Sequence, residues 1–171
     1  RRRFVGPLRG DVLEVCAGTA LNTYEAATSV TYLDASEGML DRAREKRREG
    51  TFVVGDALAL PFADASFDAV VETFCLCVIE DPGEALREMR RVVKPGGTVV
   101  LLDNTRPTAP AQAAFLDATQ GLLSSAGDLN KQCRPDKLDL SALLQDDDFR
   151  FDVLAYESFG LDFFSAVTLR R

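Results

Sequence analysis

The stretch 11–22, DVLEVCAGTALN, constrains the fold of this chain more than any other. Apolar residues around Glu14 run into a series of small residues centred on Gly18, which predicts a strand over 12–15, a tight turn and a helix over 21–28. Small side chains let a ligand approach the turn backbone closely. A helix N-terminus after the turn would present free N–H groups to ligand oxygens. We therefore expect a cofactor site at this turn, although the turn alone, with one glycine, is as typical of a purely structural turn.

Strand-like and helix-like segments alternate along the first two thirds of the chain. Ser36 is a suitable N-cap for the second helix, and Gly50 is suited to end it. The alternation predicts parallel strands joined by crossover helices. The expected strands are 12–15, 29–33, 51–54, 67–72 and 98–102, and the other expected helices are 36–49 and 82–93.

The last third has a different character. It predicts a helix over 109–125, a polar loop over 124–135, a short helix over 136–144 and two extended runs, 149–157 and 161–169, that pair as a hairpin. The predicted fold class is α/β: a Rossmann-like, doubly wound, mostly parallel seven-stranded sheet with an antiparallel terminal hairpin. We expect residues 1–171 to form one domain.

Charge and residue usage exclude several kinds of function. The net charge of −7 argues against a broad electrostatic grip on nucleic acid. The chain has no histidine, the commonest general base and metal ligand, so we predict no metal site and assign no catalytic residue. No apolar run is long enough to span a membrane. Cys75 and Cys77 do not form a zinc pattern, and we expect all four cysteines, with Cys16 and Cys133, to be reduced thiols.

Three acidic residues fall at or beside the ends of the first three predicted strands. Asp34 is placed to accept hydrogen bonds from two ribose hydroxyls, and Asp56, Ala57 and Met39 could surround an adenine. Glu14 and the small-residue turn would face the polar end of the same ligand. Taken as a set, these residues favour a nucleoside-type ligand. Singly, Asp34 and Asp56 could equally be caps or turn residues, and Met39 could be a core residue.

Four ordered stretches resemble the class I S-adenosylmethionine-dependent methyltransferases of the type-11 domain group. They are VLEVCAGTALN (12–22), LDASEGMLDRA (33–43), VVGDALALPFADASFDAVV (53–71) and EDPGEALREMRRVVKPGGTVVLLD (80–103). The segment 73–82, together with Asn22, resembles a narrower branch that contains thiol methyltransferases and mitochondrial methyltransferase-like proteins. Family members carry helices before the first strand that are nearly absent here.

The resemblance implies S-adenosylmethionine as cofactor, with S-adenosylhomocysteine as product, and a set of cofactor-binding residues. Glu14, Ala17 and Gly18 would face the methionine end of the cofactor, and Asp34, Ala35 and Met39 the ribose and adenine. Asp56 and Ala57 would meet the adenine edge, and Thr73 and Phe74 would border the site of transfer.

The predicted function is methyl transfer to a small-molecule acceptor. The expected location is intracellular, in the cytoplasm or the mitochondrion, and a protein partner is compatible with the sequence. The alternative is a methyltransferase-like scaffold or assembly factor with lost or residual activity. It is motivated by Ala20, which replaces a glycine of the family's turn, by the near absence of the helices before the first strand, and by the lack of an evident catalytic base. A nicotinamide-dependent dehydrogenase is disfavoured by the single-glycine turn.

Overall fold

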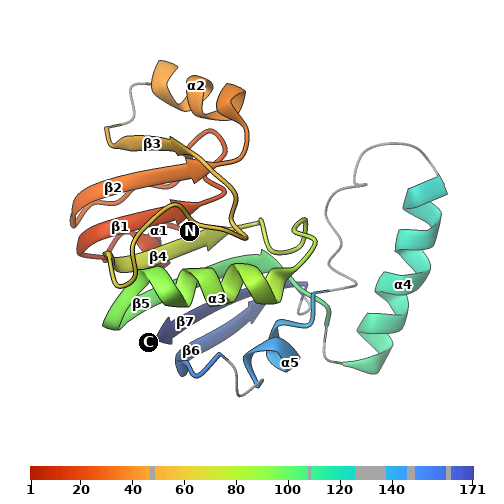
Figure 1. Cartoon of the computed structure of the whole chain (residues 1–171). Helices are drawn as coiled ribbons and strands as arrows, with labels where there is room; N and C mark the ends of the chain where they lie inside the picture. Colours follow the sequence, from red (N-terminus) through yellow and green to blue (C-terminus); the bar gives the residue numbers. More distant parts are fainter. Residues whose placement is uncertain (47–48, 108, 126–137, 146–148, 161–162) are drawn as a thin grey trace.

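The computed structural model describes residues 1–46, 49–107, 109–125, 138–145, 149–160 and 163–171. Its centre is a seven-stranded sheet with the strand order β3-β2-β1-β4-β5-β7-β6 (Figure 1). The strands are β1 (Gly10–Val15), β2 (Ala27–Asp34), β3 (Thr51–Val54), β4 (Phe67–Thr73), β5 (Val93–Asn104), β6 (Asp152–Phe159) and β7 (Phe164–Arg170). The first five are parallel, and β7 pairs antiparallel with both β5 and β6. The predicted fold class is thereby confirmed.

Helices cover both faces of this sheet. On one face, α3 (Pro82–Val92) and α5 (Leu140–Leu144) pack with the strands into the main apolar core, which includes Leu13, Val70 and Leu101. On the other face, α1 (Arg2–Val5) places Val5 against a smaller cluster. The helix α2 (Glu37–Glu45) covers Tyr32 of β2, and α4 (Pro110–Ser125) lies to one side of the sheet (Figure 1).

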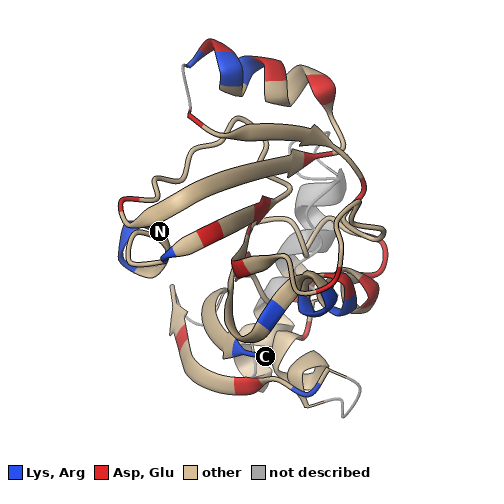
Figure 2. Cartoon of the chain, turned by 60° about the vertical axis from the view of Figure 1, so that its left-hand side comes forward, with Lys and Arg blue, Asp and Glu red and all other residues tan. Residues whose placement is uncertain are grey.

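Local signals in the sequence explain where the helices begin. Ser36 caps α2, where its hydroxyl accepts a hydrogen bond from the Met39 amide, as predicted. Asp81 caps α3 in the same way through the Glu84 amide, and Pro82 occupies the first turn, where no amide hydrogen is needed. In Figure 2 the ribbons of α2 and α3 carry both basic and acidic residue positions along their length, as expected for helices with a solvated face.

Two sequence predictions about elements are wrong. The helix expected over 21–28 is absent: residues 21–26 form bends and open chain, and β2 begins at Ala27. The reduced state expected of Cys16 and Cys75 is also wrong, because the two are joined by a disulfide with a Cα–Cα distance of 6.1 Å. Cys133 and most of the loop predicted over 124–135 lie outside the described residues.

Several boundaries also differ from those expected. The four-residue helix α1 was not anticipated, and β5 extends back to Val93 rather than starting at residue 98. In the part of the chain that the structure describes, no helix is long and apolar enough to cross a membrane.

Candidate functional site

The turn after β1 has a backbone that is unusual for its residues. Cys16, Gly18 and Ala20 have φ values of 53°, 55° and 52°, in the left-handed region that disfavours residues with a Cβ. A Cβ built on Gly18 would meet no atom within 4 Å, so open space lies directly before the turn. Ala20 is fully buried beneath α2, and its methyl group packs in the core rather than toward that space.

Because no helix follows this turn, the helix N-terminus expected to hold a ligand there is absent. Hydrogen bonds to the end of the neighbouring strand β2 fix the turn instead. The Ala17 amide donates to the Leu33 carbonyl at 2.9 Å, and the Gly18 amide donates to Asp34 Oδ2 at 2.7 Å. The second oxygen of Asp34 accepts from the Ser36 amide at 2.9 Å. Asp34 therefore holds both the turn after β1, through Gly18, and the start of α2, through Ser36. Its partly exposed side chain stands at the edge of the open space.

Glu14 lies almost completely buried, and both of its carboxylate oxygens are engaged. Asn22 Nδ2 donates to Oε1 at 2.8 Å, and the Tyr24 hydroxyl donates to Oε2 at 2.7 Å. Burial and the negative charge of Glu14 raise the pKa of Tyr24, which keeps its hydroxyl protonated. Asn22 also donates to Thr73 Oγ1 at 3.2 Å, which connects the turn after β1 to the end of β4.

Sequence reasoning did not include Asn22 or Tyr24 among the site residues. Their position, eight and ten residues after a buried acid, was the signal that could have found them, because a buried carboxylate requires donors.

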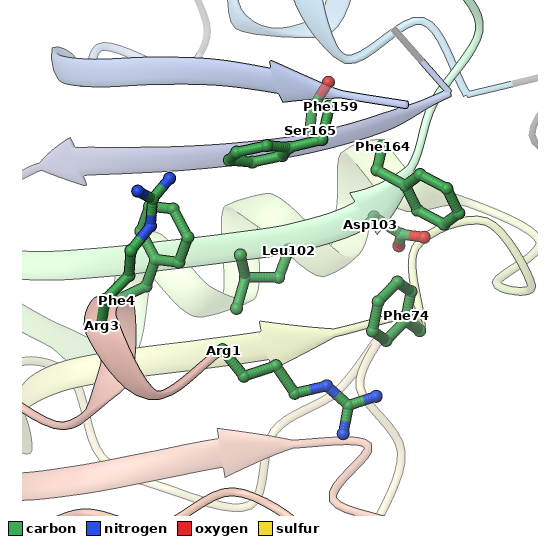
Figure 3. A pocket seen from close by; sticks show the side chains of 9 residues that line it. All are labelled: Arg1, Arg3, Phe4, Phe74, Leu102, Asp103, Phe159, Phe164 and Ser165. Carbon is green, nitrogen blue, oxygen red and sulfur yellow. The ribbon is translucent and has the colours of Figure 1, made fainter. Parts of the chain in front are cut away.

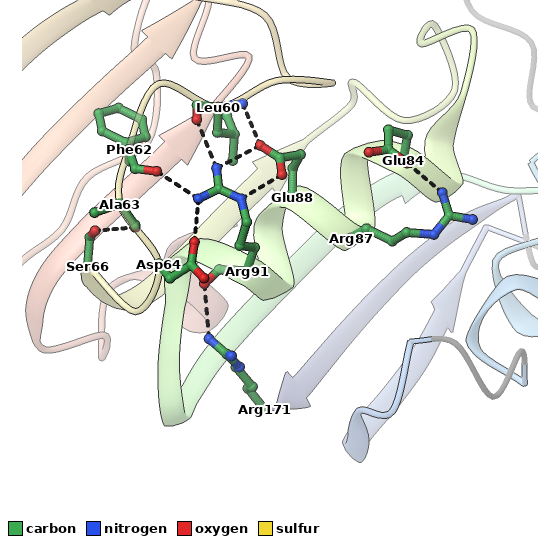
Figure 4. A network of polar contacts seen from close by, with 10 residues as sticks. All are labelled: Leu60, Phe62, Ala63, Asp64, Ser66, Glu84, Arg87, Glu88, Arg91 and Arg171. Atoms are coloured by element: carbon green, nitrogen blue, oxygen red, sulfur yellow. Dashed lines mark hydrogen bonds and ion pairs between the residues drawn. The ribbon is translucent and has the colours of Figure 1, made fainter.

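The loop after β3 carries Asp56 and Ala57. Asp56 is exposed and accepts a hydrogen bond from the Leu58 amide at 2.9 Å, whereas Ala57 is buried. The loop is held against α3 by one guanidinium, which Figure 4 shows at the centre of a polar network. Arg91 donates to the carbonyls of Leu60 and Phe62 and to the carboxylates of Asp64 and Glu88. These carboxylate contacts raise the pKa of Arg91, and Arg91 in turn lowers the pKa of Glu88.

A cavity of about 380 Å³ opens beside the end of β4 (Figure 3). Leu102 of β5 contributes to it, and the aromatic ring of Phe74 stands edge-on to that of Phe164, with 6.4 Å between ring centroids. The Arg1 guanidinium lies 4.9 Å from the centre of the Phe74 ring. The lining combines four phenylalanines with two arginines and one aspartate, and comprises Arg1, Arg3, Phe4, Phe74, Leu102, Asp103, Phe159, Phe164 and Ser165.

Two buried carboxyl groups, Glu72 and Asp103, interact next to this cavity, and Asp103 is part of its lining. Glu72 Oε1 accepts from the Cys75 and Leu76 amides, and Asp103 accepts from the Cys77 amide at 3.0 Å and the Asn104 amide at 2.6 Å. Burial, and then the neighbouring Asp103 charge, raise the pKa of Glu72 well above its ordinary value. Burial also raises the pKa of Asp103. With Glu72 protonated, its second oxygen, which otherwise has no partner, can donate to Asp103.

The sequence-predicted residues thus lie along one edge of the sheet, at the carboxyl ends of β1 to β4. The structure joins Glu14, Asn22 and Thr73 in one network and Gly18 with Asp34 in another. Ala35 and the half-exposed Met39 follow Asp34, and the Gly55 amide before Asp56 donates to the Asp34 carbonyl. No cluster of potential metal ligands occurs among the described residues.

This edge is suited to a nucleoside-type cofactor. The open space before Gly18 is what a closely bound ligand needs, and Asp34 borders it with a carboxylate that can accept further hydrogen bonds from ribose hydroxyls. A doubly wound sheet binds such ligands at the carboxyl ends of its strands, where the strand order reverses. The fold is that of a doubly wound α/β protein, and its candidate site lies at this edge of the sheet.

Comparison with known proteins identifies the family. A family model described as a methyltransferase domain matches residues 13–101. The demethylmenaquinone methyltransferase of Renibacterium salmoninarum is 45% identical over 108 residues, which is 61% of this chain and 46% of that protein. The corresponding protein of Corynebacterium efficiens is 46% identical over 102 residues, 58% of this chain and 44% of that protein. The matched part is therefore somewhat less than half the length of these relatives.

Solved structures agree on the fold. A SAM-dependent methyltransferase from Thermotoga maritima superimposes with a TM-score of 0.69 at 22% identity, covering 95% of this chain and 81% of that chain. The [4+2]-cyclase SpnF superimposes with a TM-score of 0.73 at 18% identity, covering 99% and 78%. The fold thus also carries other chemistry. On the family match, the chain belongs to the methyltransferase domain family.

Proposed function

We propose that this chain transfers a methyl group from S-adenosylmethionine to a small aromatic acceptor bound in the cavity beside Phe74. The observation that carries the proposal is that the end of β4 borders both the candidate cofactor edge and the cavity. Thr73 is hydrogen-bonded to the network around Glu14 at the cofactor edge, and the next residue, Phe74, lines the cavity.

The cofactor would lie along the carboxyl ends of β1, β2 and β3. Asp34 would hold the ribose, with Ala35, Met39 and the loop at Asp56 and Ala57 around the adenine. The methionine end would pass Ala17 and Gly18 toward Thr73. When bound, S-adenosylmethionine supplies an activated methyl group on a sulfonium, and S-adenosylhomocysteine is the product.

Transfer of a methyl group from a sulfonium by direct displacement requires little acid–base catalysis from the protein. It needs an acceptor atom aligned behind the methyl carbon in a site from which water is excluded. The rings of Phe74 and Phe164 would pack on a planar acceptor, and their edge-on arrangement leaves ring faces for it. The Arg1 guanidinium at the cavity would stabilise an acceptor oxygen that carries negative charge, whereas the Arg3 guanidinium is ion-paired with Glu157.

The relatives support this class of acceptor. Proteins 45–46% identical to the matched part of this chain are demethylmenaquinone methyltransferases, by name acting on a quinone-type ring. We therefore propose a phenol- or quinol-type acceptor, ahead of an alkyl thiol.

The test is transfer of a labelled methyl group from S-adenosylmethionine to a demethylated naphthoquinol, a simple phenol and an alkyl thiol, with products identified by mass spectrometry. We expect label on the aromatic acceptors. Phe164→Ala should raise the KM for the acceptor about tenfold and leave the Kd for S-adenosylmethionine unchanged, because an aromatic contact and its buried area are together worth about 1.4 kcal/mol or more.

Val153→Ala is the matched control. It removes a half-exposed apolar side chain on β6 that is outside the cavity lining, and it should change neither constant. Label on the thiol alone would overturn the aromatic acceptor. Cofactor binding without transfer to any acceptor would instead favour the scaffold alternative.

A further inference from the structure

The disulfide between Cys16 and Cys75 joins the two turns that wall the candidate cofactor edge. Cys16 directly follows β1, and Cys75 lies two residues beyond the end of β4. The two strands are parallel neighbours, with Val15 paired with Glu72. The bond therefore ties the ligand-facing turn, which continues through Ala17 and Gly18, to the segment that carries Thr73 and Phe74.

Both tied turns hold residues with side chains in the left-handed backbone region. Cys16 has a φ of 53° and Phe74 a φ of 60°. Such conformations are unfavourable for residues with a Cβ and persist only when the surroundings enforce them. On one side, hydrogen bonds to Leu33 and Asp34 hold the β1 turn. On the other side, hydrogen bonds from the Phe74 amide to the Leu102 carbonyl and from the Cys75 amide to Glu72 hold the segment after β4, and the disulfide ties the two turns to each other.

The two sulfur atoms differ in accessibility. Cys16 is partly exposed, although it packs against the main core, whereas Cys75 is only 4% exposed, so we expect a reductant to attack at Cys16. Cys77 is buried and outside this disulfide, and its amide donates to Asp103, whereas the Cys75 amide donates to Glu72.

We propose that the Cys16–Cys75 disulfide is a redox-active modification site that couples the thiol–disulfide state of the chain to its affinity for S-adenosylmethionine. The inference rests on the proposed function, since it assigns a redox state to the same cofactor site. In the oxidised chain the turn is preorganised for the ligand, and preorganisation increases affinity. In the reduced chain the turn relaxes, and part of the binding energy is spent on restoring it.

The reaction is exchange with a dithiol reductant. One thiolate of the dithiol attacks Cys16 Sγ, the Cys16–Cys75 bond breaks, and the Cys75 sulfur leaves as a thiolate that takes up a proton. The second thiolate of the dithiol then attacks the reductant's first sulfur atom, which is bonded to Cys16 in the mixed disulfide. The Cys16 sulfur leaves as a thiolate and takes up a proton. The dithiol is oxidised to a disulfide and the chain is reduced by two electrons.

The first experiment maps the thiols of the air-oxidised whole chain. Alkylation in denaturant without reductant, followed by peptide mass spectrometry, should modify Cys77 and recover Cys16 and Cys75 as a disulfide-linked peptide. After treatment with dithiothreitol, Cys16 and Cys75 should both be alkylated. Alkylation of these two residues in the untreated chain would overturn the proposal.

The second experiment measures the Kd for S-adenosylmethionine by calorimetry across a series of dithiothreitol redox buffers. We expect the Kd to rise about tenfold on reduction, in step with the reduced fraction, which corresponds to about 1.4 kcal/mol. Circular dichroism on the same samples establishes that the reduced chain stays folded. An equal Kd in both states, or tighter binding by the reduced chain, would overturn the coupling.

Three variants separate the causes. Cys75→Ser should bind with the weaker Kd in every buffer, and Cys77→Ser, the matched control, should keep the full redox response. Cys16→Gly removes the disulfide but supplies a residue that adopts a φ of 53° without cost, so it should bind independently of redox state and more tightly than Cys75→Ser. Equal, weak binding by both of these variants would refute preorganisation of the turn as the cause.

The outcomes also distinguish this inference from the proposed function. A mapped disulfide in a folded chain that binds no S-adenosylmethionine in either state would refute the proposed function. Binding that is present but insensitive to dithiothreitol would refute the redox coupling alone.

Discussion

Glu72 gives the sharpest stability prediction, because it is a fully buried carboxyl beside Asp103. Its folded-state pKa lies well above 4.5, its ordinary value, so the folded chain retains a proton that the unfolded chain releases. The unfolded state then binds fewer protons, and the free energy of unfolding falls as the pH rises through this window. Each pH unit costs about 1.4 kcal/mol while the difference is one proton.

Glu72→Gln removes this penalty. The glutamine carbonyl can accept from the Cys75 amide as Glu72 does now, and its amide group can donate to Asp103. The two chains should be similar near pH 4.5, and above it the variant should gain about 1.4 kcal/mol over the natural chain for each pH unit through which folded Glu72 keeps its proton.

The assay is urea denaturation of both chains at several pH values from 4.5 to 8, with linear extrapolation to water. Glu88→Gln is a control of opposite sign. Arg91 lowers the pKa of Glu88, so Glu88 contributes stability at neutral pH that is lost as the pH falls through its lowered pKa. The Glu88→Gln variant should be less stable than the natural chain at pH 7. Parallel pH curves for the natural chain and Glu72→Gln would refute the assignment of a retained proton to Glu72.

Two further predictions concern the turn and the loop of the site. Gly18→Val puts a branched side chain at a φ of 55° and fills the open space in front of the turn. Calorimetry should then show loss of cofactor binding, and the free energy of unfolding should fall by about 1–2 kcal/mol. Retained binding would contradict a cofactor site at this turn. Arg91→Ala removes the guanidinium that pins the loop carrying Asp56, and should lower the melting temperature by several degrees, about 1–3 kcal/mol. The control is Arg44→Ala, which breaks an exposed ion pair within α2 and should lower the melting temperature by less than about two degrees. Equal shifts of the melting temperature in the two variants would show that the Arg91 network does not stabilise the chain.

The alternation of segments was enough to predict the sheet. The strand over 51–54 and the cap at Ser36 are where the sequence places them, because each depends on its own residues: β-branched and aromatic side chains in the strand and a local side-chain hydrogen bond at the cap.

The features that sequence reasoning missed depend on distant residues. The helix predicted over 21–28 does not form because Asn22 and Tyr24 direct their polar groups to the buried Glu14, and residues of weak helix propensity yield to such a contact. The disulfide joins residues 59 positions apart, which become neighbours only once β1 and β4 pair. The cofactor-binding residues carried over from the family, Ala35 and Met39 among them, stay predictions, although they lie on the expected edge of the sheet.

The central claim is that the carboxyl edge of β1 to β4 binds S-adenosylmethionine, and calorimetric titration of the oxidised chain with that cofactor tests it most directly. We predict saturable binding at one site per chain, competed by S-adenosylhomocysteine. Asp34→Ala removes the acceptor for the ribose and also releases the Gly18 amide, so it should weaken binding at least tenfold in a chain that remains folded. A folded natural chain that gives no binding heat at millimolar cofactor, or an Asp34→Ala variant that binds with unchanged affinity, would contradict the account.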